Sequence, residues 1–122
     1  NGQAADWYPG DEYVDIIGED VYPGEKQYGS QFGRFSKALE YTSTKKIIAM
    51  TENGCLFDPD LAFKENARWA WFGTWSGEFV INNTTKAYSE QYTEKHMLKK
   101  VYSHERVLSL IDIPDIKTYP LD

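Results

Sequence analysis

The sequence is poor in cysteine, in basic residues and in long apolar runs. Cys55 is the one cysteine among 122 residues, so neither an internal disulfide nor a cysteine-based metal site is expected. Lys and Arg number 13 against 19 Asp and Glu, a net charge of −6, which argues against nucleic acid as a partner because phosphates need a basic face. No apolar run approaches the roughly 20 residues that span a bilayer, so no membrane partner is expected.

Nucleotide and metal motifs are missing as well. The stretch after Tyr22 has no glycine fingerprint, and the chain has no P-loop. His96 lies on a Lys-rich stretch and His104 in a polar turn, with no second ligand beside either of them. We therefore expect no cofactor and no metal. No charged-then-apolar leader opens the chain, which starts at Asn1, so we expect a processed mature chain or an excised piece of a longer one.

Aromatic residues, in contrast, are abundant. The chain has 4 Trp, 9 Tyr and 6 Phe together with its excess of carboxylates. Many rings and many carboxylates form a composition that suits sugar binding, although core packing also uses rings.

Apolar runs alternate with helical patterns along the chain. β-branched and aromatic runs predict three strands, at 14–18, 47–50 and 69–75. The first two runs are almost continuously apolar, which is typical of strands that are covered on both faces. Helical spacing predicts three helices, at 32–39 with Ser30 as cap, at 59–66 after Asp58, and at about 90–102. The apolar tail 107–114 is expected to pack against the rest of the chain.

This order predicts an α/β fold with right-handed crossovers and a parallel sheet. Three strands make a poor free-standing domain because both edges stay unpaired. We therefore interpret residues 1–122 as a single partial domain, about half of a (β/α)8 TIM barrel, whose full length is around 250 residues. Such a piece should self-associate, aggregate or pair with its missing half.

Reactive groups lie at the carboxyl ends of the strands in folds of this kind. The first predicted strand leads into Glu19, Asp20 and Tyr22, the second into Glu52-Asn53, and the third into Trp75 with Glu78 beyond. Carboxylates beside aromatic rings are what glycoside hydrolysis requires. Each residue also has an ordinary alternative: a solvated turn for Glu52, a cap for Asp20, and wall packing for Tyr22 and Trp75.

Three stretches carry a family resemblance. Residues 7–22, Trp-Tyr-Pro-Gly-Asp-Glu-Tyr-Val-Asp-Ile-Ile-Gly-Glu-Asp-Val-Tyr, closely resemble the approach to strand six, and strand six itself, of glycoside hydrolase family 26. Residues 49–54, Ala-Met-Thr-Glu-Asn-Gly, are similar to the family's strand-seven end, and 69–75 resemble strand eight. Residues 102–114 resemble its closing segment. The resemblance implies the C-terminal portion of the barrel, about strands six to eight.

The resemblance also implies roles for four residues. Glu52 would be the nucleophile of a retaining mechanism, and Tyr22 would hydrogen-bond its carboxylate and contact the sugar. Trp75 would form the stacking floor of the same subsite, and Asp20 would orient its neighbours. The acid/base Glu of the family belongs to strand four and is absent from this chain, so we expect no turnover by the chain alone. The motif 7–11 precedes strand six and is interpreted as structural.

The functional expectation is part of a secreted, extracellular endo-β-1,4-mannanase that acts on β-mannan or a related polysaccharide. Three alternatives stay open: another β-glycanase of the family such as a mixed-linkage glucanase, a non-catalytic carbohydrate-binding module, or a fragment without activity. A binding module would predict a β-sandwich. Tyr22 and Asn53 are the candidate hydrogen-bond donors that keep Glu52 ionised.

Overall fold

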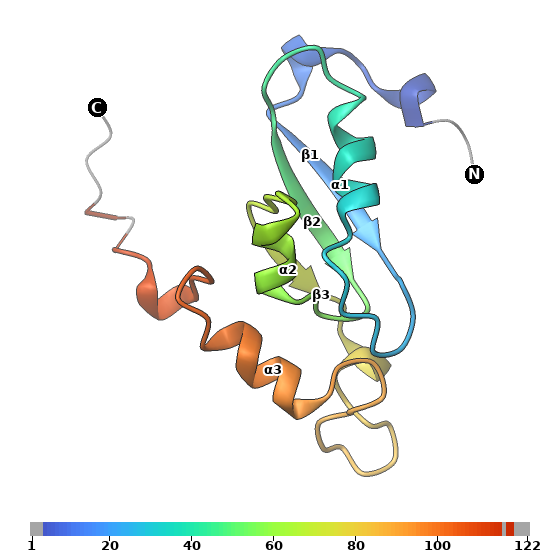
Figure 1. Cartoon of the computed structure of the whole chain (residues 1–122), viewed down its shortest axis with the longest axis vertical. Helices are drawn as coiled ribbons and strands as arrows, with labels where there is room; N and C mark the ends of the chain where they lie inside the picture. Colours follow the sequence, from blue (N-terminus) through green and yellow to red (C-terminus); the bar gives the residue numbers. More distant parts are fainter. Residues whose placement is uncertain (1–3, 116, 119–122) are drawn as a thin grey trace.

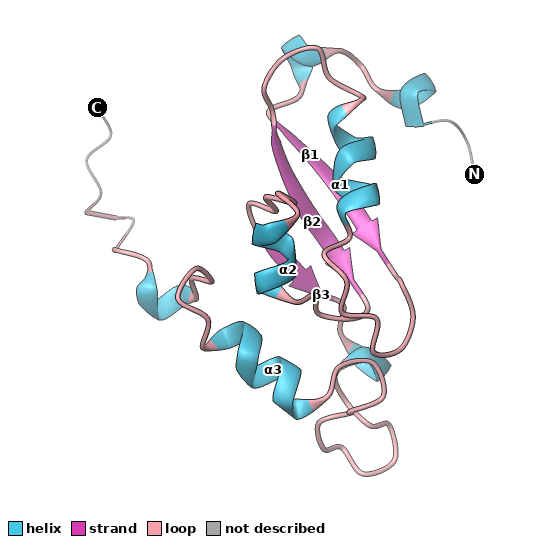
Figure 2. Ribbon diagram, in the orientation of Figure 1, coloured by secondary structure: helices cyan, strands magenta, loops and turns pink. Residues whose placement is uncertain are grey.

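Three strands alternate with three α-helices in the computed structural model, which describes residues 4–115 and 117–118 (Figures 1 and 2). In chain order the elements are β1 Ile16–Val21, α1 Phe32–Leu39, β2 Ile47–Asn53, α2 Pro59–Lys64, β3 Phe72–Thr74 and α3 Lys95–Tyr102. Four short 3-10 helices lie between or beside them: η1 Ala4–Trp7, η2 Asp11–Tyr13, η3 Gly77–Phe79 and η4 Leu110–Asp112. Over the described residues, no helix combines the length and the apolar character that crossing a bilayer requires.

The strands form one parallel sheet in the order β1-β2-β3. The predicted alternation of strands and helices is confirmed, and so is the parallel sheet. Because the strands run the same way, their carboxyl ends lie at one end of the sheet, near η3 (Figure 1). Backbone hydrogen bonds extend the pairing beyond β3, from Ala70 to Ile48 at 2.9 Å and from Trp75 to Asn53 at 2.8 Å.

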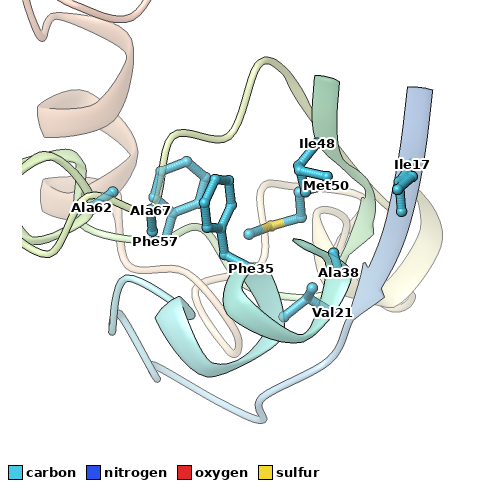
Figure 3. Packing of buried hydrophobic residues seen from close by; sticks show 9 residues of the cluster. All are labelled: Ile17, Val21, Phe35, Ala38, Ile48, Met50, Phe57, Ala62 and Ala67. Atoms are coloured by element: carbon cyan, nitrogen blue, oxygen red, sulfur yellow. The ribbon is translucent and has the colours of Figure 1, made fainter. Parts of the chain in front are cut away.

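Helices cover one face of this sheet, and the apolar core lies between them and the strands (Figure 3). Met50 is fully buried and points from β2 toward the rings of Phe35 and Phe57. Phe35 in turn meets Trp69 edge-on, with the ring centroids 5.2 Å apart. A second buried cluster, Leu56 with Met97 and Val101, attaches α3 to the sheet, and Phe72 packs against both clusters.

The opposite face of the sheet, here called the open face, is defined by the alternation of side chains along each strand. It carries residues from all three strands and their ends: Ile16, Gly18, Asp20, Tyr22, Ile47, Ala49, Thr51, Glu52, Trp71, Gly73 and Trp75. Large side chains on it are uncovered, since Ile16 is 46% and Ile47 is 51% exposed. The expectation of strands covered on both faces is therefore wrong for the described chain, in which helices pack on one face alone.

Helix starts follow the sequence signals unequally. Asp58 caps α2 as predicted, its side chain accepting from the Asp60 amide at 2.9 Å with Pro59 in the first turn. Ser30, predicted to cap α1, is not the capping residue. Gln31 takes that position with a left-handed φ of 60°, while the Ser30 hydroxyl accepts from the Phe32 amide at 3.1 Å and bonds Glu65.

The last helix and the tail differ from the expectation. The helix begins at Lys95 rather than near residue 90, because residues 90–94 form a turn in which Glu90 accepts from the Lys95 amide at 3.0 Å. The tail does not pack as predicted. Val107 is half-buried against the second cluster, but Leu110 and Ile111 are 86% and 92% exposed.

Asp11 fastens the segment before β1 to the loop between α1 and β2. Its carboxylate accepts hydrogen bonds from the hydroxyls of Tyr8, Thr42 and Ser43 at 2.7, 2.6 and 2.7 Å. Its backbone carbonyl accepts from Lys46 at 2.6 Å. Hydrogen bonds from Thr42, Tyr8 and Ser43 hold the pKa of Asp11 well below its usual range. The anchor lies at the amino ends of the strands, far from the carboxyl ends where chemistry is expected.

Replacing Asp11 by Asn should lower the stability of the protein most at neutral pH. A depressed pKa stabilises the fold fully above the ordinary pKa of an Asp; this stabilisation starts to fall below that value and is lost only as the pH falls through the depressed pKa. The midpoint difference between wild type and Asp11→Asn in urea unfolding should therefore shrink from pH 6 to pH 3. Glu12→Gln, an exposed neighbouring change, serves as control; an equal effect of both would contradict the anchoring role.

Candidate active site

The four side chains predicted to act on a sugar lie at the carboxyl end of the sheet. Asp20 is in β1 and Glu52 in β2, and they are direct cross-strand partners. Tyr22 directly follows β1, and Trp75 directly follows β3 with its amide bonded to the Asn53 carbonyl. Trp75 is 51% and Tyr22 45% exposed. The parallel sheet therefore gathers all four on the open face.

A β-bulge in β2 decides which way Glu52 points. Gly18 pairs with Ala49, but Asp20 pairs with Glu52, so β2 has one residue more than β1 between these pairs. The pairing with β3 shifts over the same stretch of β2. Without the extra residue, strict alternation would turn Glu52 toward the helices. Bulges of this kind often re-aim side chains beside active sites.

Tyr22 and Glu52 form the central contact of the site. The Tyr22 hydroxyl donates to Glu52 Oε2 at 2.7 Å. Removal from water, followed by this hydrogen bond to a carboxylate, raises the pKa of Tyr22 to about 12. The phenol therefore stays protonated at any pH near neutrality and keeps donating to Glu52.

Two further rings and a glycine hold Tyr22 in place. The Tyr22 ring packs on Phe79 with centroids 5.3 Å apart, and Phe79 packs on Tyr92 at 4.5 Å. A Cβ on Gly54 would come within 2.7 Å of both the Tyr22 and Phe79 rings. The absence of a side chain at Gly54 therefore lets the two rings pack on the backbone two residues after Glu52.

Asp20 is held by a neighbour on the bulge. Its carboxylate accepts from the Thr51 hydroxyl at 2.9 Å. Asp20 thus stands beside Glu52 across the strands, fixed by a residue adjacent to Glu52 in the chain. This arrangement suits an orienting group, and an acidic neighbour also adds negative potential to the site.

Asn53 does not serve as the second donor to Glu52 that the sequence suggested. It pairs with Val21 and lies on the helix-covered face, fully buried. Its side-chain amide nitrogen donates to the Met50 sulfur at 3.4 Å, and its side-chain oxygen Oδ1 has no hydrogen-bond partner among the described residues. The bulge explains the error, because it moves Glu52 to the open face and Asn53 away from it.

Sequence reasoning also missed the supporting residues Thr51, Gly54 and Phe79. The glycine after Glu52 was a visible signal, but a turn explains it equally well. Thr51 and Phe79 carry no signal in the sequence that separates them from ordinary strand and loop residues. Across the described ranges, the structure gathers no group of three His, Cys, Asp or Glu side chains suited to a metal ion.

An apolar groove lies elsewhere, between α2, β3 and the segment after α3. Its lining includes Trp69, Trp71, Tyr102 and Ile113. Within the described part of the chain, none of the four predicted site residues lines it. The groove therefore contributes nothing to the chemistry at the strand ends.

Comparison with protein families assigns the chain to one of them. The model of glycosyl hydrolase family 26 matches residues 1–110. The chain belongs to this family. A mannan endo-1,4-beta-mannosidase from Thermothelomyces thermophilus is 35% identical over 113 residues, which are 93% of this chain and 22% of the relative. Mannan endo-1,4-beta-mannosidase B from Piromyces sp is 28% identical over 84% of this chain and 16% of its own length. This chain thus spans about a fifth or less of the length of these relatives.

Solved structures give the same assignment. A ruminal GH26 endo-beta-1,4-mannanase matches with a TM-score of 0.76 and 28% identity, over 93% of this chain and 24% of that one. A beta-mannanase from a symbiotic protist of the termite Reticulitermes speratus, complexed with gluco-manno-oligosaccharide, matches with a TM-score of 0.71 and 32% identity, over 93% and 32%. These neighbours are TIM barrels, and the described chain is a partial α/β unit of that kind with a parallel sheet.

The phenol of Tyr22 should ionise near pH 12 rather than near 10, the ordinary value for tyrosine. The stabilisation from its neutral form should be complete below pH 10 and lost as the pH rises through 12. Spectrophotometric titration of wild type minus Tyr22→Phe isolates this group. Glu52→Gln should lower the midpoint only in part, because removal from water is the larger cause. A midpoint near 10 in the wild type would contradict the contact.

Proposed function

We propose that this segment supplies the catalytic nucleophile, Glu52, of a retaining endo-β-1,4-mannanase. The observation that carries the proposal is the 2.7 Å hydrogen bond from Tyr22 to a carboxylate that a bulge turns onto the open face. Family membership supports a glycoside hydrolase, and the names of the relatives support mannan as the substrate class.

The chemistry assigned to Glu52 has two steps. Its ionised carboxylate attacks the anomeric carbon and forms a glycosyl ester, while the bond to the leaving oxygen breaks and that oxygen takes a proton from an acid. Water, deprotonated by the same acid/base group, then attacks the anomeric carbon; the bond from that carbon to Glu52 breaks, which regenerates the carboxylate and releases the sugar with retained configuration. Tyr22 orients Glu52 through the first step, and Asp20 holds the neighbouring position.

The second carboxyl group is proposed to come from a part of the barrel outside this chain. A retaining pair requires two carboxyls about 5–5.5 Å apart with separate roles. Asp20, the cross-strand neighbour of Glu52, accepts from Thr51 and is assigned an orienting role instead. We therefore propose that β1, β2 and β3 are strands six to eight, that residues 1–122 form one partial domain, and that the rest of the barrel is its partner.

Trp75 is proposed as the stacking surface for the sugar at the cleavage site. It continues the open face directly beyond β3, next to Glu52 on β2, and half of its surface is uncovered. An exposed indole at that position offers an apolar face to a hexose, and an indole N–H can donate to a polar group. β-Mannan or a glucomannan is the proposed ligand, and a secreted enzyme is proposed because such polymers lie outside the cell.

The alternatives are separable. A carbohydrate-binding module predicts a β-sandwich, whereas this sheet is parallel and helix-covered, which favours the enzyme. A mixed-linkage glucanase would share the same nucleophile. Parallel assays of the complete enzyme on mannan and on mixed-linkage glucan separate these two, and proton NMR of the first product separates retention from inversion.

Glu52→Gln in a complete enzyme carrying this segment should reduce kcat by a factor on the order of 10⁴ to 10⁶, because the covalent intermediate cannot form. Circular dichroism and the thermal midpoint should stay close to wild type. Glu78→Gln, an exposed carboxylate beyond β3, is the matched control and should keep wild-type activity. A kcat within tenfold of wild type for Glu52→Gln would reject the nucleophile assignment.

Trp75→Ala should lower kcat/KM on mannan by roughly 10-fold to 100-fold through lost stacking in the transition state. Folding should be retained, since half of the side chain is already exposed. Trp7→Ala, at the opposite end of the strands and 83% exposed, provides the comparison ring. If Trp75→Ala loses its folded near-ultraviolet spectrum while Trp7→Ala keeps it, the indole is a packing residue and the subsite role is wrong.

A further inference from the structure

Two glycines flank the bulge that turns Glu52 onto the open face. A Cβ placed on Gly18 of β1 would lie 2.4 Å from Thr51 Cγ2 and 2.8 Å from Thr51 Oγ1. A Cβ on Gly73 of β3 would lie 3.2 Å from the Thr51 carbonyl oxygen. The Thr51 side chain thus occupies the space that a Cβ at Gly18 would fill, and the Thr51 carbonyl oxygen leaves only a tight space for a Cβ at Gly73.

Backbone conformation does not explain these glycines. Neither Gly18 nor Gly73 is among the positive-φ residues, which are Gly10, Gly24 and Gly77 together with Lys26, Gln31, Asn66 and Lys86. Glycine in a strand interior costs stability, and it commonly marks a bulge or a close backbone approach. Both marks apply to β2 here. The requirement at Gly18 and Gly73 is therefore one of space, set by the residue directly before Glu52.

Thr51 connects the space at these two glycines to the position of Glu52 and Asp20. It is one of the two β2 residues, Met50 and Thr51, that lie between the pairs enclosing the bulge; its hydroxyl holds the Asp20 carboxylate at 2.9 Å, and its backbone continues into Glu52. Displacing Thr51 would shift the peptide that orients Glu52 and would break the hold on Asp20. A shift of about 1 Å at a reacting group can cost on the order of 100-fold in rate.

We propose that Gly18 and Gly73 are positioning residues for the nucleophile. Together they form a notch that admits Thr51, and this preserves the bulge that directs the Glu52 side chain toward Tyr22. The inference rests on the proposed function in assigning a rate effect to the notch. Its geometric content, that filling the notch separates Tyr22 from Glu52, holds independently of that function.

The test is a double-mutant cycle in a complete enzyme, with Gly18→Ala, Thr51→Ala and both changes together. Gly18→Ala should lower kcat about 100-fold with a smaller change in KM, because the new methyl strikes Thr51. Thr51→Ala should cost about tenfold or less through the lost bond to Asp20. The double variant should return to the level of Thr51→Ala, because the two closest clashing atoms are gone.

Crystal structures of the same variants provide a readout that does not depend on activity. The Tyr22 Oη to Glu52 Oε2 distance should exceed 3.5 Å in Gly18→Ala and return near 2.7 Å in the double variant. If Gly18→Ala does not fold, the double variant alone should fold and regain the contact. Gly33→Ala, where a Cβ meets nothing within 4 Å, is the control and should match wild type.

The outcomes separate the two ideas. The notch is overturned if Gly18→Ala keeps the contact and wild-type kcat, or if the two single effects multiply in the double variant. It is also overturned if the loss in Gly18→Ala disappears once activity is expressed per folded molecule. An active Glu52→Gln enzyme overturns the proposed function instead. The crystallographic distances between Tyr22 and Glu52 then still show whether the notch positions Glu52.

Discussion

Parallel pairing of β1, β2 and β3 is the constraint on which the rest of the structure depends. It brings three strand ends to one rim, so residues far apart in the sequence share a face. The pairing alone would still turn Glu52 toward the core. One extra residue in β2 resets the alternation, and Tyr22 then meets the carboxylate at 2.7 Å. The site is thus the product of a regular sheet and one local departure from its regularity.

Glycines on two strands leave the space that the packing around the bulge requires. Gly18 leaves room for Thr51, and Gly54 leaves room for the rings of Tyr22 and Phe79. These missing side chains let backbone and rings approach closely, which fixes orientation more firmly than a flexible polar contact would. The hydrogen bond between Tyr22 and Glu52 is therefore the visible result of packing that begins on the neighbouring strand.

Much of this could be predicted from the sequence, for identifiable reasons. Apolar runs ending in Glu52 or leading into Tyr22 located the strand ends, because parallel strands gather those ends whatever the details of packing. The bulge could not be predicted: Met50-Thr51-Glu52-Asn53 fits strict alternation equally well, and only the pairing with β1 shows the extra residue. The same ambiguity misplaced Asn53. The prediction for Leu110 and Ile111 was wrong because an apolar side chain is more stable when buried, but its apolar character does not show that another part of the chain covers it.

Asp11 has a consequence for how this protein tolerates change. The hydrogen bonds of Asp11 lie at the amino ends of β1 and β2, which are six and seven residues long. They are therefore about 20 Å from the Glu52 carboxylate at the carboxyl ends. Over that span, screened by salt, charges at the two ends act almost independently. Acid resistance of the fold and the electrostatics around Glu52 can accordingly be altered separately, because substitutions at the amino ends of the strands leave the residues at the carboxyl ends unchanged.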